Sequence, residues 1–292
     1  MSISDQLGER KEVTLPAGTV SYRERGSGEP IVFVHGLLVN GDLWRKVVPE
    51  LSKDFRCITP DWPLGSHEQP LKPDADVTPL GVARLIADFL AALELDNVTL
   101  VGNDTGGGLC QLVVAHHPER VGRLVLTPCD AYENFPPRMF RFLVYTAHLP
   151  GGLYQLMQPM RFAPMRRTPL AFGWLAKKGI DDEITASWAR PVLKNKDARR
   201  DVVRFLRALK PALTIEAAEH FGDFKKPVLI AWAKEKAFFP LAHAEELARD
   251  FPDARLEIVE DSYAFVPEDQ PGRLVELIAA FAREPAREAS AA

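Results

Sequence analysis

Short apolar runs that do not alternate with polar residues constrain the fold of this chain more than any other feature. Such strands are buried on both faces, as the central strands of a parallel sheet are. The runs are Ile31–Val34, 55–59, Val98–Val101, 124–126, 228–231 and 256–259. Segments with apolar residues at helical spacing separate them, most clearly residues 82–93 and 274–281. The alternation predicts an α/β fold with a mostly parallel sheet.

Two further segments complete the predicted organisation. Residues 11–26 read as an opening antiparallel hairpin with a turn at Pro16-Ala17-Gly18, which brings the expected sheet to eight strands. Between residues 132 and 221 the alternation stops, and a structureless loop of that length is implausible in a compact domain. We therefore expect a core formed by residues 1–131 and 222–292, with a helical cap at 132–221.

Composition excludes several classes of protein. The 292 residues carry 40 acidic and 36 basic side chains, and this net charge of −4 argues against nucleic acid or an anionic membrane as the main partner. The three cysteines are scattered, so neither a disulfide framework nor a metal cluster is expected. No apolar run is long enough to span a bilayer. We expect a cytoplasmic monomer or homodimer without a cofactor.

The most informative motif is Gly102-Asn103-Asp104-Thr105-Gly106, which joins a buried strand to a predicted helix. This G-x-D-x-G spacing is that of a nucleophile elbow with aspartate in the central place. Glycine is needed on either side because a Cβ there would clash in so tight a turn. The alternative interpretation is an ordinary helix cap, since aspartate is favoured before a helix.

A second motif, Val34-His35-Gly36-Leu37-Leu38, follows the first parallel strand. The backbone N–H groups of Leu37 and Thr105 would then converge on one oxygen as an oxyanion hole. His35 is either a free polar group at the site or a side chain that packs beside the turn.

Together these motifs resemble the α/β-hydrolase fold, a mostly parallel eight-stranded sheet flanked by helices, with a helical cap insertion. Aspartate at the elbow is similar to the haloalkane dehalogenase and epoxide hydrolase branch. The resemblance implies that Asp104 attacks an sp3 carbon and forms an alkyl ester, which a histidine-activated water then hydrolyses.

The sequence departs from that family pattern at two positions. The histidine expected before Phe265 is replaced by Ala264, and the aspartate expected after Trp232 is replaced by Lys236. His67, which follows the fourth strand, is the leading substitute base. Asp130 at the end of the sixth strand is a candidate to orient a histidine, and Glu235 would serve as the acid only if the loop register shifts by one.

The insertion is rich in Phe and Met, which predicts a pocket for a small hydrophobic molecule. The family resemblance implies that this partner is an alkyl halide, epoxide or ester. Candidate substrate-contacting side chains are His35, Trp62 and Tyr145. Two alternatives to a hydrolase stay open. One is a ligand-binding pseudoenzyme that has lost turnover, and the other is a lyase or isomerase in which Asp104 transfers a proton.

Overall fold

A computed structural model describes residues 2–235 and 238–284 of the chain. Its strands form one eight-stranded sheet. They are β1 (Glu9–Leu15), β2 (Gly18–Arg25), β3 (Pro30–Val34), β4 (Arg56–Pro60), β5 (Val98–Asp104), β6 (Val121–Cys129), β7 (Val228–Ala233) and β8 (Ala254–Val259).

The strand order in the sheet is β1-β2-β4-β3-β5-β6-β7-β8. β2 pairs antiparallel with both β1 and β4, and all the other neighbours are parallel. The expected mostly parallel eight-stranded sheet is therefore confirmed. Every residue of β7 is buried, and β5 is buried up to its last residue, as continuous apolar runs predict for strands covered on both faces.

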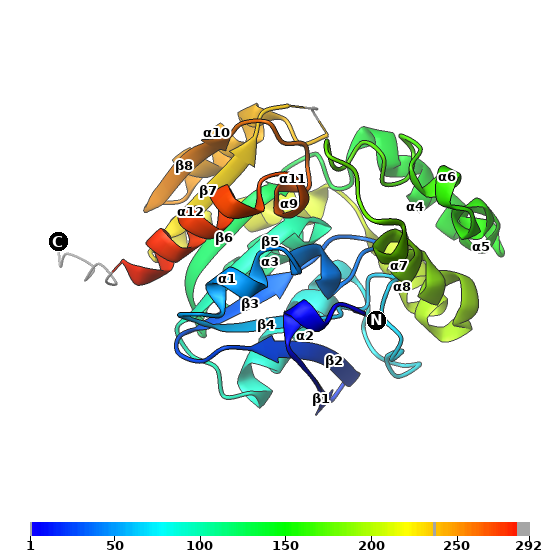
Figure 1. The fold of residues 1–292 in the computed structure, drawn as a ribbon, viewed down its shortest axis with the longest axis horizontal. Coiled ribbons are helices and arrows are strands. Elements are labelled where there is room, and N and C mark those ends of the chain that lie inside the picture. Colours follow the sequence, from blue (N-terminus) through cyan, green and yellow to red (C-terminus); the bar gives the residue numbers. More distant parts are fainter. Residues whose placement is uncertain (1, 236–237, 285–292) are drawn as a thin grey trace.

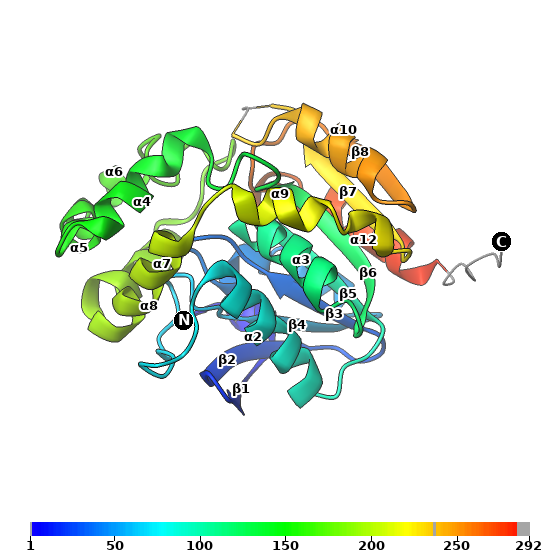
Figure 2. The same cartoon turned by 180° about the vertical axis from the view of Figure 1, so that it is seen from behind.

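Helices cover both faces of the sheet. Figure 1 shows α1 and α12 in front of it, whereas Figure 2, from behind, shows α2 and α3 on the opposite face. The helices are α1 (Val48–Leu51), α2 (Pro79–Ala92), α3 (Thr105–His116), α4 (Arg141–His148), α5 (Gly152–Met157), α6 (Ala163–Arg166), α7 (Asp182–Lys194), α8 (Lys196–Ala208), α9 (Ala212–Ala218), α10 (Leu241–Asp250), α11 (Val266–Asp269) and α12 (Pro271–Arg283).

Between β6 and β7 the chain forms helices α4 to α9. Figures 1 and 2 show α4 to α8 grouped at one side of the sheet, beyond the last strand residues of β5. No helix within residues 2–235 and 238–284 combines the length and the apolar character needed to cross a membrane.

The side chain of Asp269 joins this helical group to the C-terminal part of the chain. Its carboxylate accepts hydrogen bonds from the backbone N–H groups of Lys177, Lys178 and Tyr263, each at 2.9 Å. The N–H of Phe265 also donates to the carbonyl of Leu175 at 2.7 Å. Residues 175–178 are thereby fixed to residues 263–265.

Candidate active site

The end of β5 presents Asp104 in a strained backbone conformation. Its φ of 56° and ψ of −136° lie in a region that non-glycine residues rarely occupy, and α3 begins at the next residue. The Asp104 side chain does not cap α3. The ordinary helix-cap interpretation of this motif is therefore wrong.

The two glycines of the elbow are required by close backbone contacts. A Cβ at Gly102 would lie 2.6 Å from the Cα of Gly107, and one at Gly106 would lie 2.2 Å from the carbonyl oxygen of Val34. Both distances are far below van der Waals contact. A side chain at either position would force the turn apart.

Asp104 points across the turn that follows β3. A Cβ at Gly36 would lie 2.4 Å from Oδ2 of Asp104, so the carboxylate rests directly against the Cα of this glycine. Leu37 and Thr105 stand beside the carboxylate in the lining of one cavity. This placement brings together the three residues expected at a nucleophile and an oxyanion hole.

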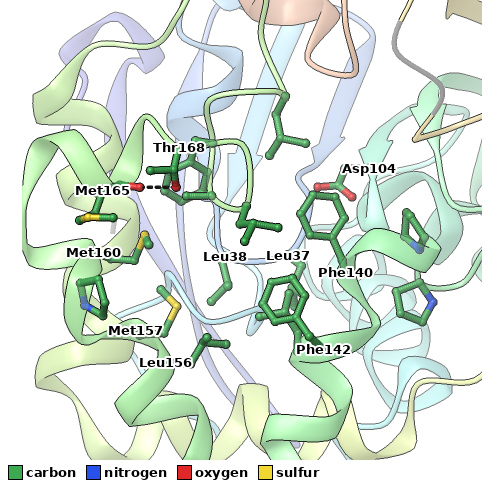
Figure 3. Close-up of a pocket in the computed structure, with 18 of the residues that line it drawn as sticks. Leu37, Leu38, Asp104, Phe140, Phe142, Leu156, Met157, Met160, Met165 and Thr168 are labelled. Carbon is green, nitrogen blue, oxygen red and sulfur yellow. Dashed lines mark hydrogen bonds between the residues drawn. The ribbon is translucent and has the colours of Figure 1, made fainter.

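The cavity has a volume of about 330 Å³ and is almost wholly apolar. Figure 3 shows Asp104 on one side and Met157, Met160 and Met165 on the other. The polar side chains of its lining, within the described ranges, are those of Asp104, Thr105 and Thr168. The remaining lining residues are apolar: Leu37, Leu38, Pro136, Pro137, Phe140, Phe142, Leu143, Leu156, Met157, Pro159, Met160, Met165, Leu170, Ala171, Phe172 and Leu175.

A second carboxyl group lies behind Asp104. The hydroxyl of Thr105 donates a hydrogen bond to Oδ2 of Asp130 at 3.0 Å, and Asp130 is fully buried. Oδ1 of Asp130 has no hydrogen-bond partner in the described part of the chain. Thr105 therefore stands between two carboxyl groups, of which only Asp104 reaches the cavity.

Burial raises the pKa of both carboxyl groups. For Asp104, burial is the largest cause, and interaction with Thr105, chiefly with its backbone N–H, offsets part of the effect. For Asp130, burial raises the pKa well above its ordinary value, and the negative charge of Asp104 raises it further. The pair therefore holds protons at a pH at which exposed carboxyl groups have lost theirs.

Comparison with known proteins agrees with this architecture. A family profile described as alpha/beta hydrolase fold matches residues 29–152. Haloalkane dehalogenase 2 of Mycobacterium tuberculosis is 28% identical over 269 residues, which cover 89% of this chain and 90% of that protein. The chain has the α/β-hydrolase fold, and its sequence is similar to those of haloalkane dehalogenases.

Solved structures share the fold of this chain at lower sequence identity. A haloalkane dehalogenase from Agrobacterium tumefaciens superposes with a TM-score of 0.77 at 23% identity, covering 96% of this chain and 99% of the other. A thermophilic esterase from Thermogutta terrifontis gives a TM-score of 0.72 at 21% identity, covering 94% and 98%. Likenesses at these identities establish the fold alone.

His35 and Trp62 are absent from the lining of the cavity. The Nε2 atom of His35 accepts a hydrogen bond from the backbone N–H of Trp62 at 2.8 Å, and Nδ1 lies 2.9 Å from the carbonyl oxygen of Gly36. Burial lowers the pKa of His35 to about 4, so the ring is neutral. The indole N–H of Trp62 donates to the carbonyl of Phe33. Their expected contact with substrate is therefore wrong, because both side chains support the turn from beneath.

His67 also turns away from the cavity. Its Nδ1 accepts a hydrogen bond from the N–H of Gly65 at 3.3 Å, and its Nε2 lies 3.4 Å from Oδ2 of Asp201 on α8. The ring is 2% exposed. This arrangement contradicts the role of substitute base, because both ring nitrogens are engaged in holding a loop against α8.

The structure also does not support the roles expected for the remaining candidate site residues. Tyr145 on α4 is 68% exposed and is absent from the cavity lining. Asp130 contacts Thr105 in place of the histidine that it was expected to orient. Glu235 forms a surface ion pair with Lys177 at 2.8 Å, so it is no orienting acid. Lys236 lies outside the described residues.

Position 264 lies beside the elbow, as the family pattern implies. The carbonyl oxygen of Ala264 accepts a hydrogen bond from Nδ2 of Asn103 at 2.9 Å, and Ala264 is 2% exposed. No imidazole lines the cavity among the residues that the structure describes. The carboxylate is thus in place without a base at the usual position.

Asn103 is a positioning residue that the sequence did not reveal. Its amide also donates to the hydroxyl of Thr127 at 2.8 Å and to the carbonyl of Pro128 at 3.1 Å. One side chain therefore joins the ends of β5 and β6 to the segment that carries position 264. The only signal in the sequence was its place next to Asp104.

Proposed function

We propose that this protein is a hydrolase-type enzyme in which Asp104 is the nucleophile toward a small hydrophobic alkyl electrophile. The observation that carries the proposal is the position of the carboxylate, which projects from a strained turn into an apolar cavity between Leu37 and Thr105. A water-poor cavity favours such an attack, because the carboxylate is not shielded by a hydration shell.

The step conserves atoms and charge. One oxygen of the Asp104 carboxylate forms a bond to an sp3 carbon as the carbon–halogen bond breaks, and the halide leaves with the electron pair. With an epoxide, a carbon–oxygen bond of the ring breaks as the ester bond to Asp104 forms, and the resulting alkoxide takes up a proton from solvent water. The N–H groups of Leu37 and Thr105 are the candidate donors to the charge that develops.

Hydrolysis of the resulting ester requires a base that activates water. General-base assistance is typically worth ~10²–10⁴-fold, and no imidazole lines the described part of the cavity. We therefore expect the ester to form and to persist. The same observation favours a second candidate function, in which the cavity binds a hydrophobic ligand without turnover.

Intact-mass spectrometry after incubation with 1-bromobutane and with 1,2-epoxybutane tests the proposal. We expect a single adduct, one butyl group or one intact epoxide, mapped by peptide sequencing to Asp104. The isosteric variant Asp104→Asn should form no adduct, and Asp130→Asn controls for alkylation of the neighbouring carboxyl group.

The two candidates give different results in this experiment. If ligands raise the thermal midpoint but neither an adduct nor a product is formed, the protein is a binding protein. If Asp104→Asn forms the adduct as readily as the parent, Asp104 is not the nucleophile.

A further inference from the structure

The helical segment that supplies most of the cavity has an unusual charge. Residues 134–180 contain seven Arg and Lys residues and no Asp or Glu, although the whole chain carries a net charge of −4. The positive side chains are Arg138, Arg141, Arg161, Arg166, Arg167, Lys177 and Lys178. The net charge of the chain therefore conceals a local excess of positive charge.

Ion pairs neutralise only part of this excess. Arg167 pairs with Asp182 at 2.6 Å, and Lys177 pairs with Glu235 at 2.8 Å. Arg138, Arg141 and Arg161 form no ion pair with a carboxylate in the described ranges. These three guanidinium groups are left to interact with an external anion.

The same segment exposes most of the large apolar side chains on the described surface. Six of the eight belong to it: Tyr145 (68%), Leu149 (60%), Phe162 (65%), Met165 (38%), Leu170 (63%) and Trp174 (37%). The other two are Leu80 on α2 and Ile215 on α9. Scattered single residues of this kind are ordinary, and the concentration of six on one segment sets this segment apart from the rest of the described surface.

This apolar surface meets the cavity at its mouth. Met165 and Leu170 line the cavity and are also exposed to solvent. The ring of Trp174 lies 6.4 Å from that of Phe238, which lies 5.6 Å from the cavity residue Phe140. A molecule that covers this surface would therefore lie against the entrance to the site.

We propose that residues 138–178 dock on an anionic lipid surface, with the exposed apolar side chains inserted among the acyl chains. Charge complementarity selects this occupant, because unpaired arginines flank the apolar side chains and anionic lipids attract such groups. The docked mouth opens toward the hydrocarbon phase in which small apolar molecules concentrate. This binding does not depend on Asp104.

Co-sedimentation with vesicles tests the proposal on the full chain. We expect binding to vesicles of phosphatidylcholine with about 30% phosphatidylglycerol, weak binding to phosphatidylcholine alone, and release at high salt. Tryptophan emission gives a second readout, because Trp174 is exposed while Trp44, Trp62, Trp188 and Trp232 are fully buried. Insertion of Trp174 should shift the emission to shorter wavelength.

Two matched pairs of substitutions make the test specific. Phe162→Glu should weaken partitioning at least about tenfold, because it removes a large apolar side chain. Arg138→Glu and Arg161→Glu should each weaken binding to the anionic vesicles by about fivefold or more. Leu80→Glu and Arg84→Glu, both on α2, introduce the same changes elsewhere and should bind like the parent.

Several results would overturn the proposal. The first is that the parent protein binds neither kind of vesicle. The second is that the two α2 control variants lose as much vesicle binding as the variants of residues 138–178. The third is that the protein binds no vesicles and instead forms a dimer that Phe162→Glu dissociates. Asp104→Asn should bind vesicles like the parent, so failure of this proposal and failure of the proposed chemistry are distinguishable.

Discussion

Replacing Asp104 with asparagine removes one titratable carboxyl group from a buried pair and leaves the shape of the side chain unchanged. Burial raises the pKa of Asp104 from 3.8 to about 7, and Asp130 behind it is also raised. Between about pH 4 and pH 7 the folded protein therefore holds a proton that the unfolded chain has released. By linkage, the parent protein loses stability as the pH rises through this window.

The size of this change in the free energy of unfolding follows from how far the pKa of Asp104 is raised. Each pH unit corresponds to about 1.4 kcal/mol, so the rise of the Asp104 pKa from 3.8 to about 7 corresponds to at most about 4 kcal/mol. Asp104 is partly open to the cavity, which reduces this value through solvent screening. We expect Asp104→Asn to be more stable than the parent by about 2–4 kcal/mol at about pH 8 and equally stable at about pH 4.

Urea unfolding of the parent and the variant at about pH 4.5, 6 and 8 measures this difference. Asp74→Asn, which replaces an exposed carboxyl group, is the matched control and should follow the parent. Parallel pH dependences for the parent and Asp104→Asn would refute the reasoning, because they would show that the carboxyl group is not desolvated.

Further predictions concern the chemistry of the site. The rate of Asp104 alkylation should rise with pH and level off above about pH 7, as measured by adduct formation. Gly36→Ala should reduce adduct formation at least about tenfold because its Cβ would lie 2.4 Å from Oδ2 of Asp104, whereas Gly222→Ala, with no atom within 4 Å, should not. His67→Ala should leave adduct formation unchanged and lower the free energy of unfolding by about 1–3 kcal/mol; a lost adduct would restore His67 as a base. Ala264→His should shorten the lifetime of the ester in a chase experiment, and an unchanged lifetime would show that position 264 cannot supply the base.

Much of the architecture was predictable because local patterns decide it. Continuous apolar runs identified each parallel strand to within a few residues, and the helical spacing of residues 82–93 matches α2. β6 is longer than its apolar run because it continues from Val121 to Cys129 through Arg123, Thr127 and Pro128. Pairing with neighbouring strands determines such polar positions, and that information is not local.

The sequence predicted the position of a site residue only where a tight backbone turn, marked by its glycines, determines that position. The glycines at 102 and 106 mark the turn, so Asp104 could be placed from spacing alone. The direction of a side chain in a loop depends on distant partners, and His67 faces Asp201, which is 134 residues away in sequence. Asp130 was placed at the correct edge, but its neighbour there is a hydroxyl group rather than an imidazole.

The attachment at Asp269 limits how far the chain beside the cavity residue Leu175 can move. Its three hydrogen bonds and the contact between Phe265 and Leu175 make residues 175–178 and 263–265 a single unit, so this wall cannot swing outward without breaking all of them. Met165 and Leu170 line the cavity and are exposed, so the cavity opens to solvent at these residues. The width of that opening, rather than the volume behind it, sets the largest molecule that can be exchanged quickly.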